Sequence, residues 1–575
     1  MVIACTRDCY DTCVFDSSHK VLPTFPFEGF TCSRGIADMK RNSVNRVKDF
    51  MIDGSIATMD EAVRKVVKEI KARKPTEIIH VDYDGNQGLL TWYFPARFWN
   101  AIHSAITDYS ICSSEGHLAI SKVYGSSFGA TPEDFSKADS FVIWGSDPKT
   151  SFIHGWKLMK GKYKVTVDVR LSPTAKESDR AIIIKPSSDA FLALGVLKSL
   201  HEMGYSDEIP TPWEVIEEET GVRRREVEEL ASVYEERKPL TVIGFALGRT
   251  FQGGKAISMI SAIPSLLGIK RGFYYSNSSY GINFSYLRGT SKASRVVGMA
   301  DVYKEVEKGN ITFMFVWNSN PLHSLPGSDR IAEAVEEGRL FLVVHDPFMN
   351  ETAKIANVVI PAPTYLEKED VVYSYWHRYL VYNKPILPKS GVDEITLMRA
   401  LAREMEVTDE SVWEDPWVAV EKATGVNIQE LKFKGVMKLP EPEFRKPRLE
   451  IPALERVPKG KVLVFGSHPN FTNSQFKEIY GRKEPVAFNS SLEGIGYLRS
   501  KWGKIRVKFV KVDDVPDGVI FMFKSNLFDL DGKPVNSIIG NEKGESGTPL
   551  LNFTLVQTEI EKEHEEQVKE EVNCC

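Results

Sequence analysis

Apolar residues in the first three quarters of the chain alternate between helical and strand-like spacing. Residues 60–74 carry them at helical intervals, as do residues 191–203. Short apolar runs, of the length expected for strands covered on both faces, occur at residues 78–81, 140–144, 163–167, 239–244, 312–317 and 340–344. Helical segments that alternate with such strands predict an α/β fold with parallel sheets.

The pattern changes near residue 438. Residues 438–459 contain five prolines among charged residues, which is typical of a linker. Beyond it, residues 461–465, 504–512 and 519–523 have the spacing of strands, with few helical segments between them. The sequence therefore predicts a smaller, β-rich C-terminal domain.

Two segments of the α/β part repeat each other. Residues 141–148 (Phe-Val-Ile-Trp-Gly-Ser-Asp-Pro) parallel residues 314–321 (Met-Phe-Val-Trp-Asn-Ser-Asn-Pro). Each is followed by a second apolar strand, which ends at Asp168 or Asp346, and six residues later by the same Thr-Ala-Lys. Small polar and acidic residues at the carboxyl ends of parallel strands are typical of nucleotide sites. The repeat indicates two nucleotide-like ligands; the alternative is a duplicated α/β unit that binds nothing.

Length and charge narrow the class of protein. The 575 residues suggest about three to four domains. The formal net charge of −5 argues against nucleic acid or an acidic membrane surface as a partner. No apolar run reaches the roughly 18 residues that span a bilayer, and the N-terminus lacks the pattern of a secretory leader. We expect a cytoplasmic protein.

The seven cysteines are unevenly placed. Cys5, Cys9, Cys13 and Cys32 form one group, Cys112 stands alone, and Cys574 and Cys575 end the sequence without an assigned role. Four thiolates from a compact segment satisfy a [4Fe–4S] cluster. Structural zinc sites usually pair cysteines as two close doublets, so the spacing favours the cluster over zinc.

The segment Cys5-Thr-Arg-Asp-Cys9-Tyr-Asp-Thr-Cys13, closed by Cys32-Ser-Arg-Gly, resembles the [4Fe–4S] segment of the molybdopterin oxidoreductases, the dimethyl sulfoxide reductase superfamily. Other segments resemble that family in the same order along nearly the whole chain: residues 84–88, 94–100, 144–148, 168–170, 185–189, 318–321, 346, 351–353 and 361–367.

The resemblance implies a bis-molybdopterin guanine dinucleotide cofactor that holds one molybdenum or tungsten ion between two related half-domains. It implies one dinucleotide at Gly145, Ser146, Asp147, Asp168, Arg170 and Asp189. It implies the other at Asn318, Asn320, Asp346 and Thr352. Arg34 stands where many members have a lysine between cluster and pterin.

Cys112 stands where many members carry the protein ligand of the metal, 80 residues after Cys32 and just before a helix. A thiolate suits a soft Mo or W centre, and Ser113 or Ser114 is expected to cap that helix. The alternative is a buried cysteine of the core. Formate dehydrogenases that resemble this chain have histidine where Ser113 stands, and His117 is out of register. Arg288 either corresponds to their substrate-side arginine or is an ordinary surface residue.

These observations predict a multi-domain α/β protein with two related dinucleotide-binding domains, a small N-terminal iron–sulfur domain and a β-barrel-like C-terminal domain. The expected domains are residues 1–45 for the cluster, 46–108 with 291–445 for one dinucleotide, 109–290 for the other, 446–560 for the cofactor-capping domain, and 561–575 as a charged tail.

The expected function is that of a Mo- or W-dependent oxidoreductase acting on a small substrate. Electrons would pass through the pterin cofactor and the single cluster to a ferredoxin-like carrier or another electron-transfer subunit, because the sequence has no nicotinamide fingerprint. Formate dehydrogenase-like and sulfur-compound reductase-like activities stay open. Two further alternatives are a vestigial electron-transfer subunit without Mo or W and a non-redox hydratase on the same scaffold.

Overall fold

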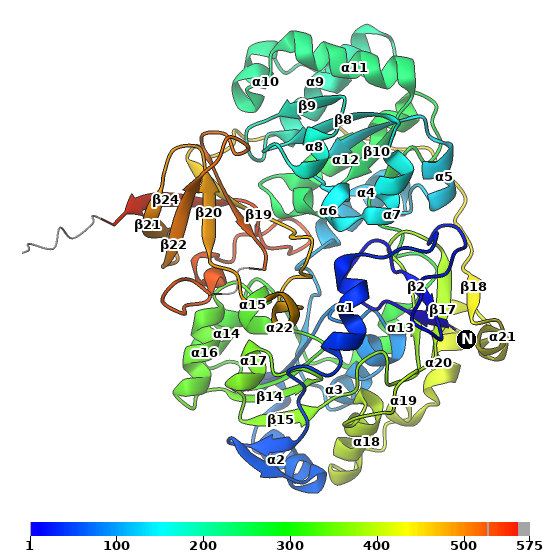
Figure 1. Cartoon of the computed structure of the whole chain (residues 1–575), viewed down its shortest axis with the longest axis vertical. Coiled ribbons are helices and arrows are strands. Elements are labelled where there is room, and N and C mark those ends of the chain that lie inside the picture. The colour runs from blue at the N-terminus through cyan, green and yellow to red at the C-terminus, as the bar shows by residue number, and fades with distance from the viewer. Residues whose placement is uncertain (1, 526–527, 562–575) are drawn as a thin grey trace, which may run out of the picture.

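The computed structural model describes residues 2–525 and 528–561. Two α/β units lie one above the other, the barrel lies to one side of both, and the N-terminal segment with helix α1 lies between them (Figure 1). The α/β class and the β-rich C-terminal part predicted from the sequence are confirmed. No helix of the described residues is long and apolar enough to cross a membrane.

The N-terminal segment is a hairpin followed by one helix. Strands β1 (Val2–Ala4) and β2 (Val14–Asp16) pair antiparallel, and helix α1 (Ser33–Arg41) begins directly after Cys32. The Cys5 amide donates to the Cys13 carbonyl over 2.8 Å. Two of the four grouped cysteines therefore lie opposite each other at the end of the hairpin.

The upper unit contains a five-stranded sheet in which every strand pair is parallel. Its order is β11 (Phe273–Tyr274), β10 (Leu240–Ile243), β7 (Ser140–Trp144), β8 (Tyr163–Asp168), β9 (Arg180–Ile183). The helices of this unit are α4 (Ser114–Tyr124), α5 (Pro132–Lys137), α6 (Pro148–Ser151), α7 (Ile153–Met159), α8 (Pro173–Lys176), α9 (Asp189–Glu202), α10 (Trp213–Thr220), α11 (Arg224–Arg237), α12 (Gly253–Leu266) and the short η3 (Phe245–Arg249).

The lower unit contains a six-stranded sheet. Its order is β4 (Ser55–Ala57), β3 (Phe50–Ile52), β15 (Val358–Pro361), β14 (Phe341–Asp346), β13 (Phe313–Trp317), β5 (Ile78–Asp82). Four strands are parallel, and the β3–β4 hairpin adds an antiparallel edge. The helices here are α2 (Met59–Lys71), α3 (Ala96–Ala101), α14 (Val302–Glu307), α15 (Pro321–Ser324), α16 (Ser328–Glu336), α17 (Glu351–Lys354), α18 (Glu394–Glu404), α19 (Glu410–Trp413) and the short turns η1 (Pro75–Glu77), η2 (Leu89–Tyr93) and η4 (Thr290–Lys292).

Helix α2 illustrates why the sequence pattern predicted these elements. Thr58 accepts a hydrogen bond from the Glu61 amide while the Glu61 carboxylate accepts one from the Thr58 amide, which is a capping box. The helix buries one face, formed by Ala62, Val63, Val66, Val67 and Ile70, against the lower sheet. The apolar spacing at residues 60–74 thus corresponds to this helix, and the run that follows it is β5.

The remaining elements form two smaller sheets and the C-terminal barrel. Smaller sheets are formed by β6 (Ile106–Thr107) with β12 (Val296–Val297), and by β16 (Asp370–Val372), β17 (Tyr379–Asn383) and β18 (Val436–Lys438), with helices α13 (Phe284–Arg288), α20 (Pro416–Thr424) and α21 (Ile428–Lys434) nearby. The C-terminal barrel is closed by β19 (Lys461–Gly466), β23 (Val519–Phe523), β20 (Val486–Asn489), β22 (Lys504–Lys511), β21 (Gly494–Arg499) and β24 (Thr554–Ile560), and carries α22 (Lys477–Tyr480) and η5 (Val535–Ile538).

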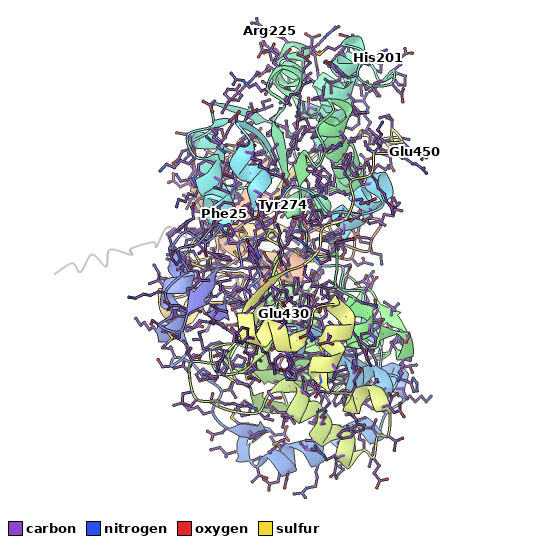
Figure 2. The ribbon with its side chains drawn as sticks, turned by 90° about the vertical axis from the view of Figure 1, so that its right-hand side faces the viewer. Phe25, His201, Arg225, Tyr274, Glu430 and Glu450 are labelled. Carbon is purple, nitrogen blue, oxygen red and sulfur yellow. The ribbon has the colours of Figure 1, made fainter. Side chains whose placement is uncertain are left out.

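The predicted linker is an extended segment between β18 and β19, with neither helix nor strand. It rises from the lower unit along the outside of the upper one, with Glu450 at the outer edge (Figure 2). The Arg448 amide donates to the Val123 carbonyl over 2.8 Å, which fixes the segment to the end of α4. The domain bounds drawn from the sequence stay predictions, and residues 562–575 lie outside the described part of the chain.

Candidate functional site

Two adjoining cavities lie at the carboxyl edges of the two sheets. The larger, of about 290 Å³, lies between the five-stranded sheet, the barrel and the N-terminal segment. The smaller, of about 170 Å³, lies beside the six-stranded sheet. They have one wall in common, formed by Asp8, Tyr83, His323, Ser324 and Asn473.

Most of the site residues predicted from the sequence line one of these cavities. The larger cavity is lined by Arg34, Cys112, Gly145, Ser146, Asp147, Asp168, Arg170 and Asp189. The smaller is lined by Asn318, Asn320 and Asp346. Thr352 lines neither cavity and is fully buried behind Asn320.

The internal repeat has the same hydrogen bonds in both halves. The Thr174 hydroxyl donates to Asp147 Oδ1 over 2.6 Å and accepts from the Lys149 amide over 3.0 Å. The Thr352 hydroxyl donates to Asn320 Oδ1 over 2.6 Å and accepts from the Leu322 amide over 3.2 Å. The threonine of each Thr-Ala-Lys therefore fixes the polar residue at the end of the preceding strand.

The backbone of the repeat also matches. Gly145 has φ of 54° and Asn318 has φ of 56°, so in both segments of the repeat the backbone adopts a left-handed conformation directly after the strand. A Cβ at Gly145 would meet the Leu247 side chain at 1.8 Å, which explains why glycine stands there. Asn318 has room for its side chain, whose Nδ2 donates to the Tyr83 and Asn86 carbonyls over 2.8 and 2.9 Å.

Three carboxyl groups that line the cavities, two at strand ends and Asp189 at the start of α9, have little compensating charge nearby. Burial raises the pKa of Asp168, and raises the pKa of Asp189 and of Asp346 to about 7. Asp168 Oδ1 accepts from the Val169 amide, and Asp346 Oδ1 accepts from the Phe348 amide, each over 2.7 Å. A ligand that brings N–H donors to these carboxyls would stabilise their ionised form.

The four N-terminal cysteines are free thiols with cationic neighbours. Arg7 Nη1 donates to Cys5 Sγ over 3.0 Å, and Arg34 Nε donates to Cys32 Sγ over 3.4 Å. Burial raises the pKa of Cys32, but Arg34 and Arg7 more than offset it, so that this pKa lies below its ordinary value. Cationic donors beside several thiols fit a group that binds them as thiolates.

Four thiols from one segment are a donor set that an iron–sulfur cluster can use. Among residues 2–525 and 528–561, no three His, Cys, Asp or Glu side chains converge closely enough to hold one metal ion. A cluster binds each cysteine to a different iron atom and therefore spaces the sulfurs more widely. Burial, the charge of Asp11 and the charges of the other three thiols raise the pKa of Cys13, so the four thiols lie within electrostatic reach of each other.

Cys112 lies between the two α/β units. It packs partly against the cores of both units and lines the larger cavity, one residue before the N-cap of α4. Burial raises the pKa of its thiol to about 12, and Asp8 adds to this, whereas Arg249 and Lys524 oppose it. A bound cation would be needed to hold this sulfur as a thiolate.

Two expectations about the surroundings of Cys112 are wrong: the cap by Ser113 or Ser114, and the surface position that was one of two alternatives for Arg288. Ser113 has helical backbone angles and its side chain makes no cap, and the Ser114 hydroxyl donates to the Tyr109 carbonyl over 3.0 Å instead. Arg288 is not a surface residue, because it is only 8 % exposed, with its guanidinium 3.6 Å from the centre of the Tyr109 ring. It does not line the cavity of Cys112 either.

Arg34 and His117 differ in their relation to the cavity. Arg34 extends from Cys32 to the barrel, where its Nη1 donates to the Phe471 carbonyl over 3.1 Å, and it lines the larger cavity. It therefore lies between Cys32 and that cavity. His117 is outside the lining, and its Nδ1 lies 2.6 Å from the Ser127 hydroxyl.

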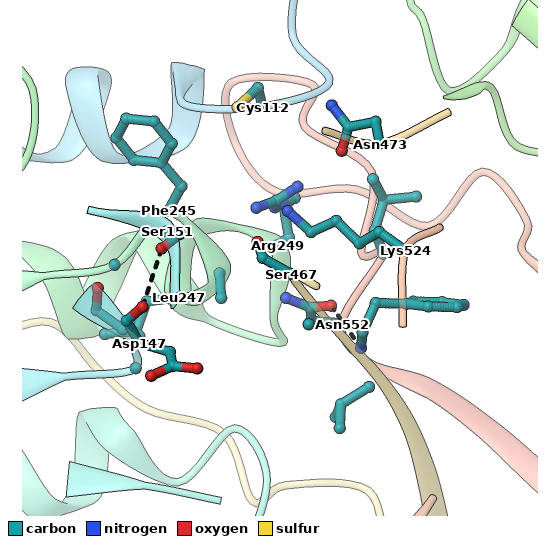
Figure 3. A pocket seen from close by; sticks show the side chains of 18 of the residues that line it. Cys112, Asp147, Ser151, Phe245, Leu247, Arg249, Ser467, Asn473, Lys524 and Asn552 are labelled. Carbon is teal, nitrogen blue, oxygen red and sulfur yellow. Dashed lines mark hydrogen bonds between the residues drawn. The ribbon is translucent and has the colours of Figure 1, made fainter. Parts of the chain in front are cut away.

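Several cavity residues had not been identified from the sequence. Asp8 comes from the cysteine segment, Arg249 from η3, and Lys524 from the end of β23, while Ser467, Asn473 and Asn552 are further barrel residues (Figure 3). Burial lowers the pKa of Lys524 to about 8, and Arg249 adds to this. A lysine directly after an apolar strand was the available signal at 524, but local spacing does not connect it to Cys112.

This chain is similar in sequence to a known protein family and to several known proteins. The family model described as molybdopterin oxidoreductase matches residues 59–388. A probable oxidoreductase, YyaE, of Bacillus subtilis is 26% identical over 76% of this chain and 74% of its own. The alpha subunit of an F420-dependent formate dehydrogenase of Methanocaldococcus jannaschii is 23% identical, over 58% of this chain and 57% of its own.

A solved structure has a similar fold. Acetylene hydratase from Pelobacter acetylenicus matches with a TM-score of 0.75, at 13% identity, over 97% of this chain and 98% of its own. At that identity the likeness concerns the arrangement of elements alone.

Proposed function

The chain belongs to the molybdopterin oxidoreductase family and is an oxidoreductase; from this premise we propose that its two cavities bind two pterin guanine dinucleotides around one Mo or W ion, with Cys112 as the protein ligand of the metal. The observation that carries the proposal is the repeat. The same hydrogen bonds recur at the two strand ends, and the two cavities beside them adjoin at a wall next to Cys112.

The larger cavity would hold one dinucleotide by Gly145, Ser146, Asp147, Asp168, Arg170 and Asp189. The smaller would hold the other by Asn318, Asn320 and Asp346, with Thr352 fixing Asn320 from behind. The half-buried carboxyls Asp168 and Asp346 match a guanine base, whose N–H groups can donate to them.

The four grouped cysteines would hold one [4Fe–4S] cluster, with Arg7 and Arg34 balancing the thiolate charge. When bound, the pterin-held metal and the cluster supply two-electron exchange with the substrate and one-electron conduction to a separate carrier. The formate dehydrogenase relative is named as an alpha subunit, which supports a separate electron-transfer chain here as well.

The chain itself positions groups and excludes water. Tyr10, Tyr83 and Phe245 line the larger cavity with Cys112 and add aromatic surface to it. Asn473 Nδ2 donates to Asp8 Oδ2 over 3.2 Å, which orients this carboxyl toward the wall that both cavities have in common. Burial raises the pKa of Asp8, so this carboxyl is suited to hold a proton beside the reacting centre.

The two alternative functions, a hydratase and a vestigial electron-transfer subunit, differ from the proposed oxidoreductase because neither exchanges electrons with a substrate. A hydratase on this scaffold moves no net electrons, and a vestigial subunit has no need of Cys112 or of the two strand-end carboxyls. The test is turnover of anaerobically purified protein with reduced and oxidised viologen dyes against formate, nitrate and sulfur compounds. We expect dye-coupled turnover in the wild type, and loss of it in Cys112→Ala. Substrate conversion that proceeds without any dye would contradict the oxidoreductase assignment of this site.

A further inference from the structure

Two cationic side chains reach into the larger cavity toward Cys112 (Figure 3). Arg249 ends η3 in the upper unit, and Lys524 follows β23 of the barrel. They come from segments 275 residues apart in the sequence, and the packing of the barrel against the upper unit brings them to one wall. Both act on the charge of the Cys112 sulfur.

Neither cation is neutralised within the described part of the chain. Arg249 is 9 % exposed, its Nε has no hydrogen-bond partner, and no carboxylate forms an ion pair with either side chain. Arg46 and Arg97 are paired, with Glu367 at 2.8 Å and with Glu414 at 2.6 Å. Buried Arg378 instead donates to three backbone carbonyls. Burying a cation without a counter-charge is costly, so the Arg249–Lys524 wall is prepared for an anion.

The Arg249–Lys524 wall lies apart from the end of the larger cavity that is proposed to bind the nucleotide. Asp147, at the strand end, lies well away from Cys112 in Figure 3. Arg170 lies at that end too, 3.9 Å from Asp147 and stacked on Phe521. A cation for the nucleotide phosphates is therefore available elsewhere, and the Arg249–Lys524 wall faces the sulfur instead.

The acidic group nearest this wall is Asp8, whose charge acts on Lys524 and on Cys112. Asp8 is engaged by Asn473. Two cations against one carboxyl still leave an excess of positive charge, and the planar guanidinium of Arg249 can donate two parallel hydrogen bonds to a pair of oxygens.

We propose that the substrate is a small anion with at least two acceptor oxygens, a carboxylate or an oxoanion, held between Arg249 and Lys524 beside Cys112. The proposal rests on the proposed function, since it assumes that Cys112 marks the reacting centre. It excludes neutral substrates such as sulfoxides and alkynes from tight binding at this wall, because they bring no charge to the two cations.

The test measures, by calorimetry, the equilibrium binding of sodium formate, sodium nitrate and neutral dimethyl sulfoxide to the anaerobically purified holoenzyme. The variants are Lys524→Gln and Arg249→Gln. If Lys524→Gln fails to accumulate, Lys524→Met replaces it. The control is Lys511→Gln, which removes an exposed lysine at the end of β22. Guanine nucleotide and metal are measured in every preparation.

We expect at least one of the two anions to bind the wild type, and each site variant to weaken that binding about 10- to 100-fold, the range for losing one charge-assisted hydrogen bond. Lys511→Gln should bind like the wild type, and guanine nucleotide content should not change in any variant. Dimethyl sulfoxide should bind weakly and equally to all of them.

Three results would overturn the anion site: binding of neither anion to loaded wild type, unchanged anion affinity in both site variants, or loss of guanine nucleotide together with anion affinity. The last would assign the two cations to the cofactor phosphates. Failure of the proposed function is seen separately, as a wild-type preparation that contains neither Mo or W nor guanine nucleotide.

Discussion

Asn318 holds the loop of residues 83–86, which lines the smaller cavity, so substitution of Asn318 tests the structure of that cavity. Its Nδ2 donates to the Tyr83 and Asn86 carbonyls over 2.8 and 2.9 Å, and its φ is 56°. Asn318→Ala removes two hydrogen bonds, worth about 1 kcal/mol each. It also leaves a Cβ in a left-handed conformation that alanine adopts less readily, which adds about 1 kcal/mol. Asn318→Gly loses the same bonds without the strain, so we expect about 3 kcal/mol for alanine and about 2 kcal/mol for glycine.

Hydrogen exchange of residues 83–86 measures this cost locally, because the Gly85 amide donates to the Asn318 carbonyl over 3.0 Å. Opening should become about 30-fold more frequent in Asn318→Gly and about 140-fold in Asn318→Ala, at 1.4 kcal/mol per factor of ten. The control is Asn310→Ala, which removes one exposed hydrogen bond of 3.3 Å in the same unit and should leave the loop unchanged. Equal exchange in all three variants, or faster exchange in glycine than in alanine, would refute the reasoning.

Three further substitutions test the assignment of the site. Cys112→Ala should keep iron and guanine nucleotide but lower turnover to below about one hundredth, a barrier increase of about 2.7 kcal/mol; full activity in this variant would disprove the ligand role. Cys9→Ala should remove the iron absorbance and lower the melting temperature, because metal binding and folding of such segments are coupled; iron content equal to the wild type would contradict it. Thr174→Val and Thr352→Val each leave the hydrogen-bond partner of the threonine unpaired, at a cost of about 1–3 kcal/mol. Each variant should reduce bound guanine nucleotide toward one per chain. A variant that keeps two per chain would show that the threonine does not support its cavity.

The fold was largely predictable because its signals are local. Each strand of the repeat is a short apolar run that ends in polar residues, and α2 combines a capping box with one apolar face. The antiparallel β3–β4 hairpin at the edge of the lower sheet was missed, since its residues are half-buried in β3 and mostly exposed in β4 and carry no strong alternation.

The candidate site was predictable only where it follows a strand in sequence. Asp168 and Asp346 end apolar runs, so their place at a sheet edge could be inferred. Arg249 and Lys524 lie close together only because the barrel packs against the upper unit, which no local spacing encodes. The surface alternative for Arg288 was wrong for the same reason: three aromatic rings from residues 92–109 surround it.

The repeat also shows how one arrangement can be built from different residues. Gly145 and Asn318 adopt the same left-handed turn, but Leu247 crowds the first while the second is open enough for a side chain. Asp147 and Asn320 are held by equivalent threonines, although one carries a charge and the other an amide. The two cavities therefore have the same frame with different electrostatics, and we expect the two dinucleotides to be released at different rates when the protein is heated.

We propose that two dinucleotides and one metal are held around Cys112, with a cluster at the N-terminal cysteines. The most direct measurement is the composition of wild-type protein purified without air: Mo, W, iron, acid-labile sulfide and extractable guanine nucleotide per chain. The account predicts one Mo or W, two guanine nucleotides, and four iron with four sulfide. Iron and sulfide without Mo, W or guanine nucleotide would contradict it.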